Sequence, residues 1–209
     1  MKNMFDADNK FNMLLAKLGD LIVLNIIFCV TCIPIFTIGA AVTAMYEITL
    51  KMAKNQEAYI VKSYFKSMKS NFKKATKAGL LAEIIGLILA VDLWIVMPNS
   101  GNVWIGVSIA LLIVSFVFVM IISYFFPILA KFEDSMKNIL KSSIFMAMGF
   151  LPVTLGVVIL NCAGLLVFLC MGNYEVIFYI LAVYCTVGFA LTAFLNSIML
   201  VNVFEKFYK

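Results

Sequence analysis

The chain has 209 residues, of which 64% are hydrophobic and 13% are charged, and its formal net charge is +5. Ordinary globular proteins contain roughly 45–50% apolar and about 25% charged residues, and a soluble fold of this length has too small a core to bury so much apolar surface. This composition excludes a soluble enzyme, a disordered chain and a disulfide-stabilised secreted module. It predicts an all-α, polytopic membrane protein in which residues 1–209 form a single integral membrane domain.

Five stretches of the sequence are long and apolar enough to cross a bilayer, because a hydrocarbon core of about 30 Å requires roughly 20 helical residues. Backbone polar groups find no water inside the bilayer, so each stretch is expected to be a helix. The apolar residues do not alternate along the chain as the strands of a membrane barrel require. The expected helical bundle has about five spans, at residues 21–46, 79–97, 103–130, 142–172 and 176–204.

The distribution of lysines predicts the orientation in the cell membrane. Of the 16 lysines, thirteen follow the first span, in residues 47–78, 131–141 and 205–209, and three precede it. The positive-inside rule then places the C-terminus in the cytoplasm and the N-terminus outside. Pro34 lies within the first span, which is therefore either a kinked crossing or a re-entrant segment. The topology around Pro34 stays open at this point.

Residues 56–78 are expected to form an amphipathic helix on the cytoplasmic side. Apolar residues recur there at three- and four-residue steps, and lysines occupy the remaining arc of the helix. The lysines expected to contact lipid headgroups are Lys62, Lys66, Lys69, Lys73 and Lys77. The same pattern allows a second interpretation, a helix that binds a partner protein. Nucleic acid is not expected as a partner, because the aromatic residues of the helix are needed for its membrane face.

Polar residues inside the predicted spans form a candidate intramembrane polar site that consists of Glu83, Asp92, Asn161 and Asn196. An ionised carboxylate at the centre of a membrane helix costs on the order of 2.5–3.5 kcal/mol, so Glu83 and Asp92 need an explanation. Asn25 is a similar case to the other two asparagines. One interpretation is a proton- or substrate-coupling site, and the other is structural hydrogen bonding between helices.

The sequence contains no histidine and no arginine. Ser-His-Asp catalysis, Cys-His catalysis and HExxH metal sites all require histidine. Cys29 and Cys32 have the spacing of a redox or metal motif, but they lie in an apolar segment without a nearby cation that would stabilise a thiolate. We therefore expect no catalytic residue, no metal site, no cofactor and no enzymatic activity.

A pattern in the N-terminal part is shared with known proteins. It runs from Lys17 to Asn25 as KLGDLIVLN and from Pro34 to Tyr46 as PIFTIGAAVTAMY. With this pattern the chain resembles the YesL-like family of small bacterial membrane proteins, which has no assigned biochemical function. Members are often encoded beside ATP-driven carbohydrate importers and glycan-degrading enzymes, so the resemblance implies a role linked to sugar uptake.

The second half of this pattern also has a physical interpretation as a packing motif, formed by Pro34, Thr37, Gly39, Thr43 and Tyr46. Pro34 leaves a carbonyl without its helical donor, and threonine hydroxyls can donate to such a group. Gly39 belongs to a face of small residues that lets a neighbouring helix approach closely. The tightest helix packing is therefore expected around the inner half of the first span.

Three hypotheses for the function follow. The first is a non-enzymatic membrane protein that assists or regulates a carbohydrate uptake system, with the lipid bilayer and ABC-type carbohydrate permease subunits as partners. The second is a small secondary transporter or channel, acting as a homo-oligomer, with a polar path near Glu83. The third is a structural or sensory protein of the envelope whose lysine-rich helix responds to lipid charge.

Overall fold

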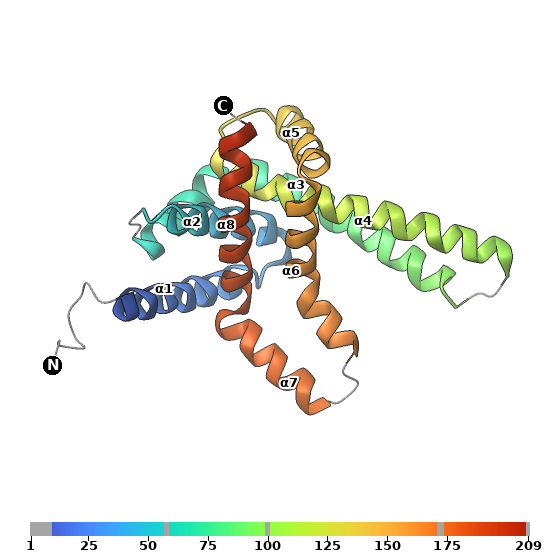
Figure 1. The fold of residues 1–209 in the computed structure, drawn as a ribbon, viewed down its shortest axis with the longest axis horizontal. Helices are drawn as coiled ribbons and strands as arrows, with labels where there is room; N and C mark the ends of the chain where they lie inside the picture. The colour runs from blue at the N-terminus through green and yellow to red at the C-terminus, as the bar shows by residue number, and fades with distance from the viewer. Residues whose placement is uncertain (1–9, 57–58, 99–100, 171–173, 208–209) are drawn as a thin grey trace.

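The computed structural model describes residues 10–56, 59–98, 101–170 and 174–207, and this part of the chain is helical apart from short connections (Figure 1). The helices are α1 (Lys10–Thr31), α2 (Ile38–Ala53), α3 (Ile60–Val96), α4 (Asn102–Lys131), α5 (Met136–Gly149), α6 (Leu151–Cys170), α7 (Tyr174–Val183) and α8 (Phe189–Phe207). A 3-10 turn (Ile35–Thr37) precedes α2, and a π-helical turn (Tyr184–Gly188) joins α7 to α8. The described residues contain no strand, which confirms the expected all-α fold.

Several helical segments are long and apolar enough to cross a membrane. Four qualify individually, at Ile35–Ala53, Ile60–Val96, Val103–Lys131 and Phe178–Phe207. The bent pair Met136–Gly149 and Leu151–Cys162 brings the number to five if it is taken as one span. These segments support a membrane protein, while the side on which each terminus lies stays a prediction.

The expected first span, residues 21–46, is not one helix. α1 ends at Thr31, and the chain is extended at Pro34 (φ −76°, ψ 114°) before α2 begins. Pro34 disfavours the helical conformation in the residue before it and has no N–H to donate, so the helix cannot continue through this point. The chain then turns back, so that the end of α2 lies beside the start of α1. There the Lys17 ammonium donates to Asn55 Oδ1, just beyond the end of α2, at 2.8 Å.

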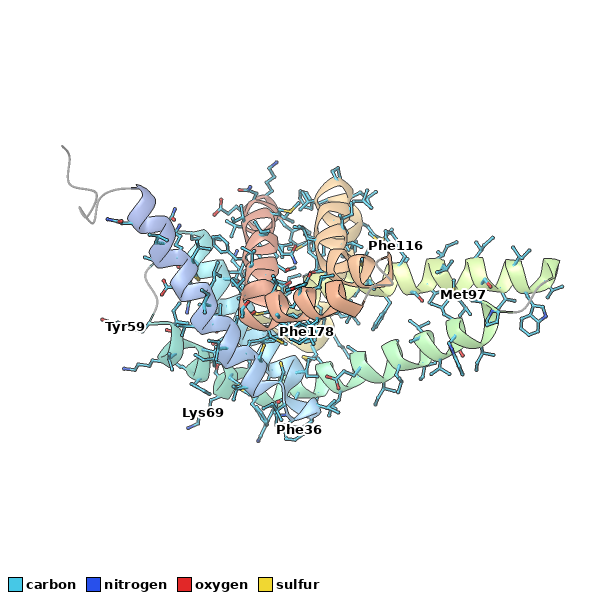
Figure 2. All side chains as sticks on the ribbon, turned by 90° about the horizontal axis from the view of Figure 1, so that it is seen from below. Phe36, Tyr59, Lys69, Met97, Phe116 and Phe178 are labelled. Atoms are coloured by element: carbon cyan, nitrogen blue, oxygen red, sulfur yellow. The ribbon has the colours of Figure 1, made fainter. Side chains whose placement is uncertain are left out.

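Two expected elements, the amphipathic helix 56–78 and the span 79–97, form one continuous helix. This helix, α3, has 37 residues and contains no proline, although residues 57–58 lie outside the described part. The change from charged to apolar composition at Gly79 alters the helix surface and not its backbone hydrogen bonds. At 1.5 Å per residue α3 is about 55 Å long, longer than a hydrocarbon core of about 30 Å. Figure 2 places Tyr59 and Lys69 toward one end of α3 and Met97 toward the other.

The fourth expected span, residues 142–172, is also interrupted, and its last two residues lie outside the described part. α5 and α6 meet at Phe150 with a bend of 103°. Pro152 follows in the first turn of α6, where a missing N–H is tolerated, and Gly149 ends α5. Apolar composition extends through this bend, which explains why a single span was expected here.

The last expected span, residues 176–204, contains the π-helical turn between α7 and α8. A π-helical turn interrupts the regular pattern of backbone hydrogen bonds. The Asn25 side chain of α1 provides hydrogen-bond partners for backbone groups of this turn. Its Nδ2 donates to the carbonyl oxygens of Tyr184 at 3.0 Å and Cys185 at 2.8 Å. Its Oδ1 accepts from the Ala190 N–H at 2.9 Å. Asn25 is fully buried, and it joins α1 to the α7–α8 junction.

α2 lies at the centre of the molecule, where it packs against α3, α4 and α8. Small residues allow this, since a Cβ atom added to Gly39 would lie only 2.7 Å from the Cα of Gly79 on α3. From this centre the α3–α4 hairpin and the α6–α7 hairpin extend in different directions (Figure 1). In the most apolar part of α4 only 6% of the residues are buried, against 67% in the segment that contains α2.

Candidate functional site

A cavity of about 710 Å³ lies where the ends of α2 and α4 meet the lysine-rich half of α3. Its wall contains five lysines and two glutamates, so the cavity is cationic. The charged residues are Glu47, Lys51, Lys54, Lys66, Lys74, Lys131 and Glu133. The neutral polar residues are Gln56, Ser67, Ser70 and Asn71. This site is not predicted from the sequence, because its lysines come from three separate stretches that only the fold brings together.

Some of the cavity lysines have acidic partners. Lys51 Nζ lies 2.6 Å from Glu47 Oε1, one helical turn away on α2. Lys54 Nζ lies 3.2 Å from Glu205 Oε1 near the end of α8. Both of these ammonium groups are therefore neutralised in part by the protein itself.

The other cavity lysines are held differently. The Lys131 ammonium lies over the rings of Phe132 and Phe204, 4.9 Å and 4.6 Å from their centroids. Lys74 Nζ donates to the backbone carbonyl oxygen of Asp134 at 3.3 Å. The Lys66 side chain is exposed and has no ion pair or hydrogen bond among the described residues. Within the described part of the chain, none of these three ammonium groups forms an ion pair with a carboxylate.

Ser67 is the most unusual neutral group in the cavity wall. Its side chain is almost fully buried, with 2% of the residue exposed, and its hydroxyl oxygen has no hydrogen-bond partner in the described part of the chain. Leaving a buried polar group unpaired costs about 1–3 kcal/mol, so such groups usually have a specific reason. One turn further along α3, the Ser70 hydroxyl donates to the Ser67 carbonyl oxygen at 2.9 Å.

The loop beside the cavity is ordered by Asp134. Its Oδ1 accepts hydrogen bonds from Asn138 Nδ2 at 2.8 Å and from the Ser135 N–H at 2.6 Å. These two donors hold the pKa of the fully exposed Asp134 carboxyl below its ordinary value of 3.8. The Ser135 hydroxyl in turn accepts from the Asn138 N–H at the start of α5.

The structure brings together two residues of the candidate intramembrane polar site. Asn196 Nδ2 donates to Asn161 Oδ1 at 2.7 Å and lies 3.3 Å from the Tyr46 hydroxyl. Asn161 Nδ2 donates to the Ser123 hydroxyl at 3.1 Å. This chain of hydrogen bonds crosses from α2 through α8 and α6 to α4. Asn196 Oδ1 is buried without a partner among the described residues.

Glu83 and Asp92 do not join this chain of hydrogen bonds. Both are partly buried on the apolar half of α3. Glu83 Oε1 is buried and has no hydrogen-bond partner in the described part of the chain. A second cavity of about 380 Å³, lined by apolar residues and by Cys29 and Cys32, does not include Glu83 either. The four predicted residues therefore do not form a single site.

The residues of the predicted packing motif lie at the break between α1 and α2 and along the first part of α2. The Thr37 hydroxyl lies 2.6 Å from the Pro34 carbonyl oxygen, and the Thr43 hydroxyl donates to the Gly39 carbonyl oxygen at 2.8 Å. Thr43 is fully buried, and Thr37 and Tyr46 are nearly so. These contacts satisfy polar groups at the place where α2 and α3 approach most closely.

The five lysines predicted to contact headgroups are all exposed on α3. Lys66 alone among them lines the cationic cavity. The other four, Lys62, Lys69, Lys73 and Lys77, lie outside both cavities, and their contact with lipid remains a prediction.

Fold and site together define an all-helical membrane protein with a cationic cavity at one end. Comparison with known proteins gives a consistent result. A family described as a protein of unknown function, DUF624, matches residues 21–93. YesL of Bacillus subtilis (strain 168), an uncharacterized protein, is 27% identical over 171 residues, which cover 81% of this chain and 78% of YesL.

A second uncharacterized protein of the same strain, YteU, is 26% identical over 137 residues, which cover 65% of this chain and 61% of YteU. No solved structure matches the chain. These matches confirm the resemblance to the YesL-like family, a family of unknown function.

Proposed function

We propose that the protein is a non-enzymatic membrane protein that binds transmembrane helices of a carbohydrate importer and assists or regulates that importer. The observation that carries the proposal is the α3–α4 hairpin, whose apolar side chains lie largely outside the core. Leu87 is 66% exposed and Ile113 is 59% exposed. The choice of a carbohydrate importer as the partner rests on the family resemblance, which implies a role linked to sugar uptake.

Glu83 favours a protein partner over lipid alone on this hairpin. Ionisable residues inside membrane helices usually face protein or a water-filled cavity, because lipid tails provide neither charge nor hydrogen bonds. Glu83 lines neither cavity; its Oε1 is buried without a hydrogen-bond partner among the described residues, and the rest of its side chain is partly exposed. A partner helix packed on this part of α3 would shield the exposed remainder of this side chain from the lipid.

Two contacts support a revised orientation in which both termini lie in the cytoplasm. The charge count alone had placed Lys17 across the membrane from residues 47–78. The hydrogen bond from Lys17 to Asn55 and the ion pair between Lys54 and Glu205 bring the start of α1, the end of α2 and the end of α8 together. The N-terminal lysines then join the other thirteen on one side, as the positive-inside rule favours.

The alternative of a secondary transporter or channel has less support. Such a path would require Glu83 to lie near the asparagines, and Glu83 lies outside the hydrogen-bonded chain through Asn161 and Asn196. Flux assays in liposomes, comparing the wild type with Glu83→Gln, test it directly. Flux by the wild type that the substitution abolishes would favour this alternative over the accessory role.

Site-specific photo-cross-linking in native membranes tests the accessory role. A photoreactive residue is placed at Leu87 on α3, and a matched control at Val30 on α1, which is exposed to a similar extent at 59%. We expect permease subunits of a carbohydrate importer among the products from position 87 and not from position 30. Permease subunits that are not enriched over unrelated membrane proteins, or equal products from both positions, would contradict the proposal.

A further inference from the structure

The cationic cavity holds more positive charge than the protein neutralises. Five lysines and two glutamates line it; one of those glutamates is paired with Lys51, and Lys54 is paired with Glu205 outside the wall. Lys66, Lys74 and Lys131 form no ion pair with a carboxylate in the described part of the chain, although Asp134 lies near Lys74 and Glu205 lies near Lys131. Ammonium groups gathered around one cavity repel each other, and an anion bound between them would remove this repulsion.

The neutral groups of the wall point to the kind of anion. Ser67 lines the cavity, its buried hydroxyl has no acceptor among the described residues, and Ser70 and Asn71 lie beside it on α3. Lysines bind a phosphoryl group as point charges, and hydroxyl groups donate hydrogen bonds to its remaining oxygens. A carboxylate carries only one charge, whereas a phosphate monoester carries up to two and balances more of the lysines.

We propose that this cavity binds a ligand through a phosphoryl group, with Lys66, Lys74 and Lys131 neutralising its charge and the Ser67 hydroxyl, after rotation of the side chain, donating to one of its oxygens. The volume, about 710 Å³, lies within the range of roughly 300–1,000 Å³ found for small-molecule sites. It also leaves room for the remainder of a larger ligand. The inference does not depend on the accessory role proposed above.

The phosphoryl group has two possible sources, a phospholipid headgroup of the cytoplasmic leaflet and a free phosphorylated solute. The full-length protein is reconstituted in phosphatidylcholine nanodiscs, and radiolabelled inorganic phosphate is titrated at an ionic strength kept constant with chloride. In a second arm, one fifth of the lipid is phosphatidic acid, and native mass spectrometry measures how much of it the protein retains. Saturable phosphate binding indicates a solute site, and selective retention of phosphatidic acid indicates a headgroup site.

Two double variants, each of which removes two positive charges, distinguish binding in this cavity from binding to the general surface charge of α3. The double variant Lys66→Gln with Lys74→Gln removes two cavity lysines, and Lys62→Gln with Lys69→Gln removes two exposed lysines outside it. We expect about tenfold weaker binding from the first pair and less than about twofold weaker binding from the second. Equal loss from both pairs, or no binding of either probe by the wild type, would overturn the proposal.

Ser67→Ala provides a second variant in case the lysine variants do not fold. Because the Ser67 hydroxyl has no partner in the described part of the protein, its removal should leave the thermal stability without phosphate unchanged or higher. The same variant should bind the effective probe about fivefold more weakly. A variant that binds phosphate and phosphatidic acid as well as the wild type does would refute the role of this hydroxyl and the assigned binding mode.

Discussion

The close approach of two helices between Gly39 on α2 and Gly79 on α3 can be tested by adding a single methyl group. In Gly39→Ala the new Cβ atom would lie 2.7 Å from the Gly79 Cα and even closer to the Ala75 carbonyl oxygen. Ordinary contacts begin at 3.4 Å, so relieving the shorter contact, with the Ala75 carbonyl oxygen, requires the two groups to separate by about 1 Å. Both contacted groups belong to the backbone, which cannot rotate away as a side chain can.

The expected loss in the free energy of unfolding follows from two opposing effects. Overpacking of a tight interface costs typically about 1–3 kcal/mol, and alanine is favoured over glycine inside a helix by up to about 1 kcal/mol. Gly39 is the second residue of α2, where the gain in helix propensity is small. We therefore expect Gly39→Ala to lower the free energy of unfolding by about 2 kcal/mol.

Equilibrium unfolding in mixed micelles, followed by circular dichroism, measures this difference. Gly106→Ala is the matched control, because Gly106 lies within α4 and a Cβ atom there meets nothing within 4 Å. The control should be unchanged or more stable by up to about 1 kcal/mol. A Gly39→Ala protein within about 0.5 kcal/mol of the wild type would refute the reasoning. Equal losses from both substitutions would indicate that glycine flexibility, and not close packing, is what matters.

Three further predictions concern other parts of the molecule. Asn25→Leu leaves the buried polar groups of the π-helical turn without partners, so the same unfolding assay should show a loss of about 2–4 kcal/mol, and an unchanged stability would exclude this role. With the native cysteines replaced by alanine, a membrane-impermeant thiol reagent should label Lys62→Cys only from the cytoplasm and Trp94→Cys only from outside; labelling of both from one side would contradict the membrane-spanning α3. The depressed pKa of Asp134 means that its carboxylate stabilises the folded state above pH 3.8 and that this contribution disappears as the pH falls through the folded-state pKa. The stability difference between wild type and Asp134→Ala should therefore be constant near neutral pH and shrink below pH 3.8, and a difference independent of pH would argue against the hydrogen bonds from Asn138 and Ser135.

Composition and hydropathy were sufficient to predict an all-helical membrane protein, because the solvent that surrounds the chain dictates both properties. They were not sufficient to place the helix ends. Residues 142–172 are apolar on both sides of the bend at Phe150, so hydropathy does not register it. The signal that was present is local: Gly149 and Pro152 flank the bend, as expected for the end of one helix and the first turn of the next.

The candidate sites were harder to predict, because they depend on which helices become neighbours. Asn161 and Asn196 were selected for their polarity, and the structure shows them hydrogen-bonded to each other. Glu83 is predicted on the same grounds but lies away from these two asparagines, since the polarity of a residue does not indicate which neighbouring helix its side chain faces. The cationic cavity was missed because Lys51, Lys66 and Lys131 are far apart in the sequence.

The length of α3 and the position of Gly79 have a mechanical consequence. Gly79 lies close to the midpoint of the helix, so the contact with α2 acts as a fulcrum between two arms of similar length, each about 25–30 Å. A rotation of about 5° around this fulcrum displaces each end of a straight helix of this length by roughly 2 Å, in opposite directions. A force on the half of α3 that ends at Val96 would therefore move the half that begins at Ile60 in the opposite direction. This movement changes the distance from Lys66 or Lys74 on α3 to Lys131 on α4, and no helix has to unfold.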